Sequence, residues 1–101
     1  MSKVHMMTLY RIKPDKLDEV TAAVAEFVAA VKENEPAVLF YEAYRGVGDV
    51  SFFHLMTFED AYSEEKHRST PHMSVFVQKL SLCCEEEPGF VDLELVGSNV
   101  R

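Results

Sequence analysis

Apolar and polar residues change their spacing along the chain, and each change marks a boundary between predicted elements. Residues 4–12 alternate and are rich in residues that favour strands, and Pro14 closes this run because proline cannot donate a hydrogen bond to a sheet. After Pro14, apolar residues recur every three or four positions, which predicts a long helix with one buried stripe. The stripe consists of Leu17, Val20, Val24, Phe27, Val28 and Val31. The sequence Asn34-Glu35-Pro36 should end this helix.

A β-hairpin is predicted in the middle of the chain. Residues 38–45 and residues 51–58 are rich in aromatic and apolar side chains, and the sequence Gly46-Val47-Gly48-Asp49 between them supplies turn residues. Both segments carry large side chains at odd and at even positions. Since successive side chains of a strand point to opposite faces of a sheet, both faces of this hairpin should be apolar.

Two short helices and a last strand complete the predicted elements. Asp60 is a suitable N-cap for a helix over residues 61–67, and Thr70-Pro71 supplies the N-cap and first position of another. The apolar stripe of that last helix consists of Met73, Phe76, Val77, Leu80, Cys83 and Cys84. Residues 85–89 should end it, and residues 90–96 alternate as a final strand.

The order of these elements is strand, helix, strand, strand, helix, helix, strand, which predicts an α+β fold. A four-stranded antiparallel sheet with its helices on one face, of the ferredoxin-like type, connects them with short loops. Residues 1–101 are expected to form one domain. The other face of the sheet would stay uncovered although its strands are apolar, so we expect a second copy of the chain to cover it in a homodimer.

Composition and charge argue against several classes of partner. The formal net charge is −7 and the basic residues are scattered, whereas nucleic-acid binding relies on clustered Lys and Arg. The first residues do not resemble a signal peptide, and the longest apolar stretch, residues 22–31, contains Glu26 and is too short to span a bilayer. We therefore expect a cytoplasmic protein that binds neither nucleic acid nor membrane.

The cysteines and histidines do not show metal-ligand spacing. Cys83 and Cys84 are adjacent, so they match neither a disulfide framework nor a CxxC site, and we expect them to act as apolar packing residues. None of the histidines forms a pair at helical ligand spacing beside a carboxylate motif. No metal site is expected.

The segment His67-Arg68-Ser69-Thr70-Pro71-His72 carries the densest group of reactive side chains. It joins the two short helices beside the apolar strand 51–58, a setting in which small-molecule pockets often form. Either His67 or His72 could be the general base that deprotonates a phenol or hydroquinone, because imidazole titrates near neutral pH. Alternatively, both could hydrogen-bond the backbone groups left free at the helix ends. His67 is the preferred base because it ends a helix that faces the sheet.

Other side chains could contact a small substrate between sheet and helices. His54, Met56 and Phe58 share one face of their strand and are candidate substrate contacts. His54 could instead be a hydrogen-bonded buried residue. Tyr41 could bind a substrate oxygen. Arg68 could hold an anionic group, although an exposed arginine is commonly solvated.

The pattern resembles the antibiotic biosynthesis monooxygenase superfamily of small dimeric α/β-barrel proteins. Glu35-Pro36-Ala37-Val38-Leu39-Phe40-Tyr41-Glu42 resembles the family's turn into its second strand, and Phe53-His54-Leu55-Met56-Thr57-Phe58 resembles its third strand. The segment Lys66-His67-Arg68-Ser69-Thr70-Pro71-His72, followed by Phe76 and Leu80, is similar to the family's His, Ser-Pro-His and Phe signature. We therefore expect Phe76 among the substrate contacts.

This resemblance implies several activities, because relatives include cofactor-free quinone-forming monooxygenases, haem-degrading enzymes and an isomerase of a phosphorylated signal. The haem-degrading branch carries its iron ligand about where this chain has Phe76, and Phe58 stands where many relatives have Trp. The resemblance thus favours a monooxygenase without a cofactor that acts on a small aromatic or quinol-like substrate. An isomerase of a small polar or phosphorylated molecule and a non-catalytic ligand-binding barrel are the alternatives.

Overall fold

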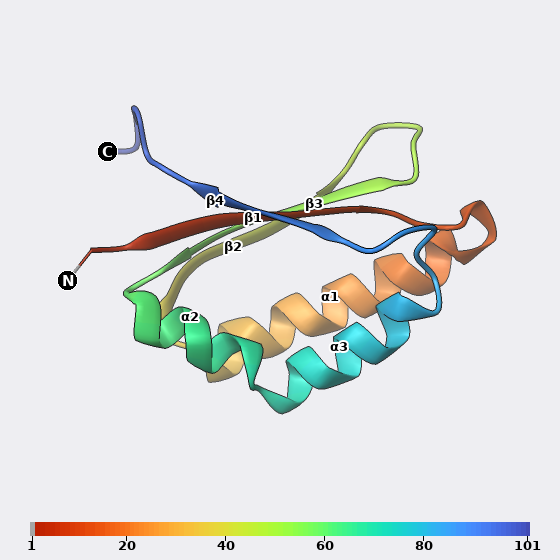
Figure 1. Cartoon of the computed structure of the whole chain (residues 1–101), viewed down its shortest axis with the longest axis horizontal. Helices are drawn as coiled ribbons and strands as arrows, with labels where there is room; N and C mark the ends of the chain where they lie inside the picture. The colour runs from red at the N-terminus through yellow and green to blue at the C-terminus, as the bar shows by residue number, and fades with distance from the viewer. Residues whose placement is uncertain (1) are drawn as a thin grey trace.

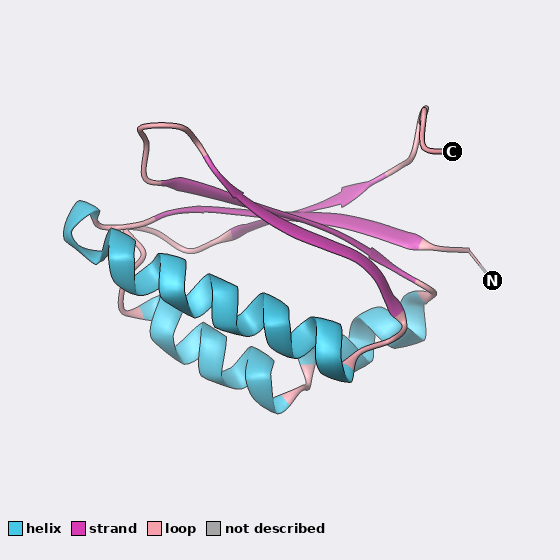
Figure 2. Ribbon diagram, turned by 180° about the vertical axis from the view of Figure 1, so that it is seen from behind, coloured by secondary structure: helices cyan, strands magenta, loops and turns pink. Residues whose placement is uncertain are grey.

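The computed structural model describes residues 2–101 and has the predicted α+β architecture (Figure 1). Its elements are β1 (Val4–Arg11), the 3₁₀ turn η1 (Pro14–Lys16), α1 (Leu17–Asn34), β2 (Val38–Arg45), β3 (Ser51–Phe58), α2 (Ala61–Arg68), α3 (Pro71–Ser81) and β4 (Gly89–Leu93). Within residues 2–101, four strands form one antiparallel sheet in the order β2-β3-β1-β4. The helices all lie against the same face of this sheet, as Figures 1 and 2 show from opposite sides. The ferredoxin-like fold class is confirmed.

Strand β3 is an interior strand of the sheet, and its side chains point alternately to the two faces. The side chains that it directs towards the helices are those of Phe52, His54, Met56 and Phe58, and all of them are buried. His54 pairs with Thr8 on β1 and with Ala43 on β2. Because side chains alternate along each strand, Tyr10 and Tyr41 also face the helices, on either side of His54.

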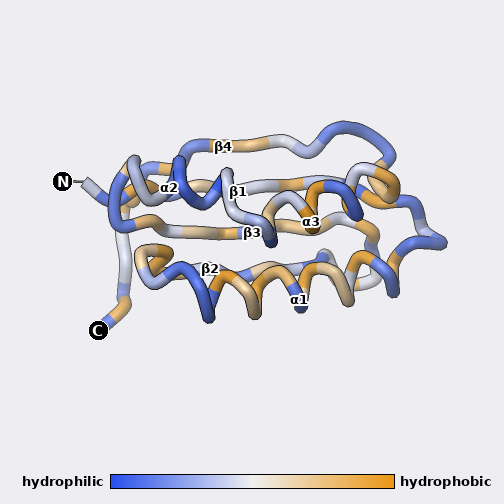
Figure 3. Tube along the Cα trace, turned by 90° about the horizontal axis from the view of Figure 1, so that it is seen from below, coloured by the Kyte–Doolittle hydropathy of each residue, from blue (hydrophilic) through white to orange (hydrophobic). Residues whose placement is uncertain are grey.

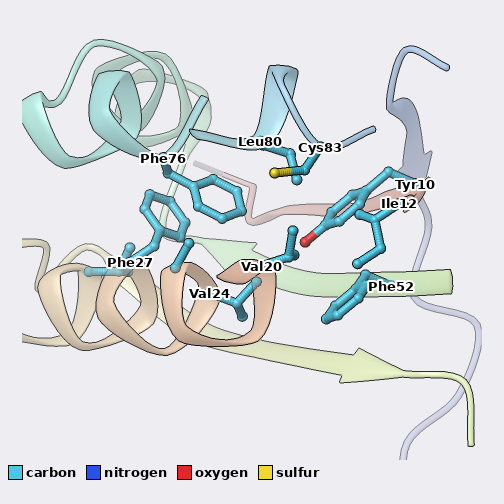
Figure 4. Packing of buried hydrophobic residues seen from close by; sticks show 11 residues of the cluster. Tyr10, Ile12, Val20, Val24, Phe27, Phe52, Phe76, Leu80 and Cys83 are labelled. Atoms are coloured by element: carbon cyan, nitrogen blue, oxygen red, sulfur yellow. The ribbon is translucent and has the colours of Figure 1, made fainter. Parts of the chain in front are cut away.

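Helix α1 closes the core through the apolar stripe that its sequence predicts, and hydrophobic and hydrophilic positions alternate along it in Figure 3. Its buried residues are Val20, Ala23, Val24, Phe27 and Val31. The ring of Phe27 stacks on Phe76 of α3 with centroids 4.7 Å apart, and the rings lie side by side in Figure 4. Such a pair contributes about 0.5–1.5 kcal/mol beyond the area it buries and joins α1 to α3. No helix within residues 2–101 is long and apolar enough to cross a membrane.

Side-chain caps fix the junction between the two short helices. The Asp60 carboxylate accepts a hydrogen bond from the backbone N–H of Ser63 at 2.8 Å, and the Thr70 hydroxyl accepts one from Met73 at 3.2 Å. Pro71 occupies the start of α3, where its missing N–H costs nothing. Both predicted N-caps are confirmed, and together they set the turn that brings His67 towards the sheet.

Helix α3 ends earlier than its apolar pattern predicts. It stops at Ser81 instead of continuing through Cys84. The residues that follow make a last turn onto Leu80 and then pair with the end of β1, where the backbone N–H of Lys13 donates to the carbonyl oxygen of Cys83 at 2.8 Å. Cys83 is nevertheless buried in the core, as its predicted packing role requires.

Strand β4 is also shorter than predicted. It ends at Leu93, whereas the alternation continues to Val96. Leu93 pairs with His5, and β1 begins only one residue before His5, so β1 could pair with at most one further residue of β4. Alternation alone cannot show where a neighbouring strand stops.

The sheet face opposite the helices is apolar and, within residues 2–101, uncovered. Its exposed large side chains include Phe40, Tyr44, Val91 and Leu93. Leu55, near the middle of this face, is partly buried by its neighbours. An isolated chain would therefore present apolar sheet surface to water, which few monomeric proteins do over a large area.

Candidate functional site

A cavity of about 250 Å³ lies between the sheet and the helices α2 and α3. The predicted site residues that line it are Tyr41, Met56, Phe58, His67, Arg68 and Phe76. Most of the other lining side chains are apolar, among them Phe27 of α1 and Phe90 of β4. Because an engineered apolar cavity of about 150 Å³ takes up benzene, this cavity has room for a substituted aromatic ring.

Two predicted site residues do not line this cavity. His54 is buried and hydrogen-bonded to Tyr10 and Tyr41. His72 lies against a separate small hollow between α1 and α3, beside Lys79. The geometry therefore gives both histidines a hydrogen-bonding role rather than direct contact with a ligand in this cavity.

His67 lies in the cavity wall and has one ring nitrogen without a hydrogen-bond partner within residues 2–101. Only 3 % of the residue is exposed, and its ring packs against Phe58 with centroids 5.1 Å apart. Its Nδ1 lies 2.9 Å from Oε1 of Glu35. A carboxylate only accepts hydrogen bonds, so Nδ1 carries the proton of the neutral imidazole and Nε2 has a free lone pair. Nε2 is buried and has no hydrogen-bond partner within residues 2–101.

Glu35 is the site residue that the sequence analysis did not identify. It follows the last residue of α1, and its side chain is 11 % exposed. Its carboxylate accepts hydrogen bonds from both His67 and His72, and Nε2 of His72 lies 2.5 Å from Oε2. A carboxylate that holds an imidazole in one tautomer is a recurring way to orient a catalytic histidine. Although a carboxylate and two imidazoles meet here, no group of three such side chains within residues 2–101 is placed to hold a metal ion.

The alternative role considered for the two histidines, binding free backbone groups at the helix ends, is wrong. Thr70 supplies that function, because its hydroxyl both accepts from the N–H of Met73 and donates to the carbonyl oxygen of His67. The rings of His67 and His72 bind the Glu35 side chain instead. The junction is thus held by a threonine, which leaves the His67 ring free to face the cavity.

The buried side chains of Tyr10 and His54 and the partly buried Tyr41 form a second hydrogen-bonded group, which reaches the cavity at Tyr41. The Tyr10 hydroxyl lies 2.7 Å from Nε2 of His54, and the Tyr41 hydroxyl lies 2.7 Å from Nδ1 of the same ring. Burial lowers the pKa of His54 from 6.5 to about 4, so its ring is neutral at neutral pH. Burial also raises the pKa of both phenols, helped by the Glu35 carboxylate in the case of Tyr41.

Acid should destabilise the protein through His54. In the unfolded chain this imidazole binds a proton near its ordinary pKa of 6.5, whereas in the folded protein it does so only near 4. Between these values the unfolded state binds more protons, so the free energy of unfolding falls as the pH falls, by about 3 kcal/mol in all. Urea unfolding at a series of pH values measures this loss. His54→Gln, which cannot be protonated, should flatten the curve in this window, and an equally steep curve would contradict the assignment.

Arg68 and Glu64 mark the rim of the cavity. Nε of Arg68 lies 2.8 Å from Oε2 of Glu64, one helical turn away, and the arginine side chain is largely exposed. Glu64 lines the cavity, and its side chain is only 16 % exposed. Glu64 thus pairs with the positive charge of Arg68 in the absence of an anionic ligand.

Comparisons with known proteins agree with this architecture. A search of solved structures finds a proposed antibiotic biosynthesis monooxygenase from Bacteroides thetaiotaomicron, which superimposes with a TM-score of 0.90 at 18 % sequence identity and covers 99 % of this chain and 95 % of its own. A second proposed member, from Caulobacter crescentus, has a TM-score of 0.87 at 19 % identity and covers 94 % of this chain and 91 % of its own. A protein from Mycobacterium tuberculosis has a TM-score of 0.87 at 13 % identity, covering 98 % of this chain and 100 % of its own. At these identities the likeness shows the fold alone.

The sequence itself gives the more specific match. No curated protein matches the chain. The family model for antibiotic biosynthesis monooxygenase, in contrast, matches residues 3–79, which include the strands β1 to β3 and the segment that holds His67. The chain therefore belongs to the antibiotic biosynthesis monooxygenase family.

Proposed function

We propose that this protein is a cofactor-independent monooxygenase that oxidises a small hydroquinone-like substrate bound in the cavity between the sheet and the helices. The observation that carries the proposal is the buried, unpartnered Nε2 of His67, a residue that lines the apolar cavity. A lone pair in this setting has no structural partner, and a phenolic O–H is a group that it can accept. The resemblance of the sequence to the cofactor-free branch supports the same reaction.

His67 would act as the general base. Its Nε2 takes the proton of a substrate hydroxyl, while Glu35 holds Nδ1–H and stabilises the imidazolium that forms. Met56, Phe58 and Phe76 surround the ring of the substrate and exclude water. Deprotonation raises the electron density of the substrate, which is what electron transfer to dioxygen requires.

The reaction balances with dioxygen as the co-reactant. The hydroquinone anion passes one electron to dioxygen, the two radicals combine to form a carbon–oxygen bond, and the resulting peroxide loses water. One oxygen atom ends in a hydroxyquinone and the other in water, so the ring gives up four electrons and dioxygen accepts four. The proton held by His67 leaves in that water, and the imidazole returns to its neutral form.

We also propose that the functional unit is a homodimer in which the uncovered face of one sheet packs against that of a second copy. The support is the apolar character of this face, where Phe40, Tyr44, Val91 and Leu93 are exposed. Burying such side chains contributes roughly 25 cal/mol per Å² of apolar surface removed from water. The cavity lies on the other face, so dimerisation leaves the site between sheet and helices available to substrate.

Oxygen uptake with a panel of substituted hydroquinones tests the proposed function. In the presence of a metal chelator, the wild-type protein should consume one dioxygen for each hydroxyquinone formed, well above the autoxidation of the same hydroquinone without protein. The dimethyl ethers of the same compounds should not react, because they offer His67 no proton. Uptake that never exceeds autoxidation, together with ligand-dependent melting, would favour a non-catalytic binding protein.

A further inference from the structure

A chain of three hydrogen-bonding side chains, Tyr10, His54 and Tyr41, ends at the wall of the cavity. We propose that the Tyr41 hydroxyl donates a hydrogen bond to the phenolic oxygen of the ligand, and that Tyr10 and His54 are positioning residues that fix the direction of this bond. The choice of a phenol as the ligand rests on the proposed function. The direction of the bond rests on the geometry and the burial of the three side chains.

Tyr10, at the buried end of this row of side chains, determines in which direction its hydrogen bonds are donated. The Tyr10 hydroxyl is buried, lies 2.7 Å from Nε2 of His54 and has no other hydrogen-bond partner within residues 2–101. If Nε2 carried the imidazole proton, it would donate to Tyr10, and the hydroxyl hydrogen of Tyr10 would be buried without an acceptor. Nε2 therefore accepts from Tyr10, and the proton of the neutral ring is on Nδ1.

This tautomer determines what Tyr41 can do. His54 Nδ1 lies 2.7 Å from the hydroxyl oxygen of Tyr41 and donates to it. The hydroxyl hydrogen of Tyr41 then has to find another acceptor, and Tyr41 lines the cavity. Because burial lowers the pKa of His54 and raises the pKa of Tyr41, both groups are neutral at neutral pH and Tyr41 keeps the hydrogen that it donates.

His67 and Tyr41 thus offer a ligand in the cavity an acceptor and a donor. The acceptor is Nε2 of His67 and the donor is the hydroxyl of Tyr41, and the two rings have centroids 5.9 Å apart. A phenol matches both, since its O–H donates to His67 while its oxygen accepts from Tyr41. Once the proton has passed to His67, the bond from Tyr41 meets a phenolate and becomes a stronger, charge-assisted one.

The ionisation of bound para-nitrophenol tests the donor, because only its phenolate absorbs strongly in the visible range. With protein in excess at a fixed pH, Tyr41→Phe should lower the ratio of phenolate to phenol about tenfold or more. Tyr10→Phe should also lower it, although Tyr10 does not line the cavity, because Tyr41 can then donate to Nδ1 of His54 instead. Tyr62→Phe removes an exposed phenol of α2 outside the cavity, and it should leave the ratio unchanged.

Nitrogen NMR of isotope-labelled imidazoles tests the positioning role without any ligand. In the wild-type protein the proton of His54 should be found on Nδ1, and a proton on Nε2 would overturn the proposal. Equal phenolate ratios in the wild type and Tyr41→Phe, or failure of para-nitrophenol to bind either, would overturn it as well.

These outcomes are separable from those of the proposed function. A lower phenolate ratio in Tyr41→Phe without hydroquinone-dependent oxygen uptake would support the donor and contradict the monooxygenase. Oxygen uptake with an unchanged ratio would support the monooxygenase and contradict the donor.

Discussion

Replacing His67 with alanine should lower the turnover of a hydroquinone about 100-fold, which is the lower range of what a general base contributes. The reason is that His67 lines the cavity and its buried Nε2 has an unpartnered lone pair, while Nδ1 is held by Glu35. The measurement is the initial rate of oxygen uptake at saturating hydroquinone, so that a change in affinity does not enter. His72 should not replace the lost base, because it lies outside the cavity.

A second variant separates the loss of the base from the loss of stability. His67→Ala also removes a donor from the partly buried Glu35 carboxylate, which should lower the free energy of unfolding by about 1–3 kcal/mol. His67→Gln keeps a polar side chain next to Glu35 but cannot take up a proton, so its turnover should fall as far while its stability falls less. Turnover close to the wild-type rate in both variants would remove His67 from the catalytic role.

Placing a charge in the middle of the uncovered sheet face should convert the protein to a monomer. Leu55 faces away from the helices on β3, between Met7 of β1 and Glu42 of β2. Leu55→Glu would bury a carboxylate at the centre of the proposed interface, twice in each symmetric dimer, next to the existing Glu42. Because burying an unpaired charge costs several kcal/mol, the dissociation constant should rise about 100-fold or more. Sedimentation or light scattering across a dilution series measures it.

Leu82→Glu is the matched control for this experiment. Leu82 is largely exposed and directly follows α3, a helix that lies on the opposite side of the sheet from the face in question. The same chemical change there should leave the dimer intact. A wild-type protein that stays monomeric at micromolar concentration would contradict the dimer outright. So would a Leu55→Glu variant that dimerises as tightly as the wild type.

The order and type of the elements were predictable because each is encoded locally. The spacing of Val20, Val24, Phe27 and Val31 defines one helical stripe, and Pro14 and Pro36 delimit it. Element ends were less predictable where they depend on a distant partner. Helix α3 stops because the residues after it pair with the end of β1, and no local pattern contains that information.

In the candidate site, too, local sequence predicts some residues, while others depend on distant partners. His67 could be predicted from its own segment, because a histidine at a helix end beside an apolar strand has few other places to point. Glu35 is 32 residues away along the chain, and only the packing of α1 against α2 and α3 brings it to His67. Tyr10 lies 44 residues from His54, and their hydrogen bond depends on the register of β1 against β3. Long-range register is what a sequence pattern does not contain.

The fate of the oxygen atoms tests the central claim most directly. Turnover of a hydroquinone under dioxygen labelled with the heavy oxygen isotope, followed by mass spectrometry, should place one labelled atom in each hydroxyquinone. Authentic unlabelled hydroxyquinone, incubated for the same time in isotopically labelled water, corrects for exchange with solvent. The account predicts a label in the wild-type product and about 100-fold slower formation of labelled product in His67→Ala. A product whose added oxygen comes entirely from water would contradict the assignment of this protein as a monooxygenase.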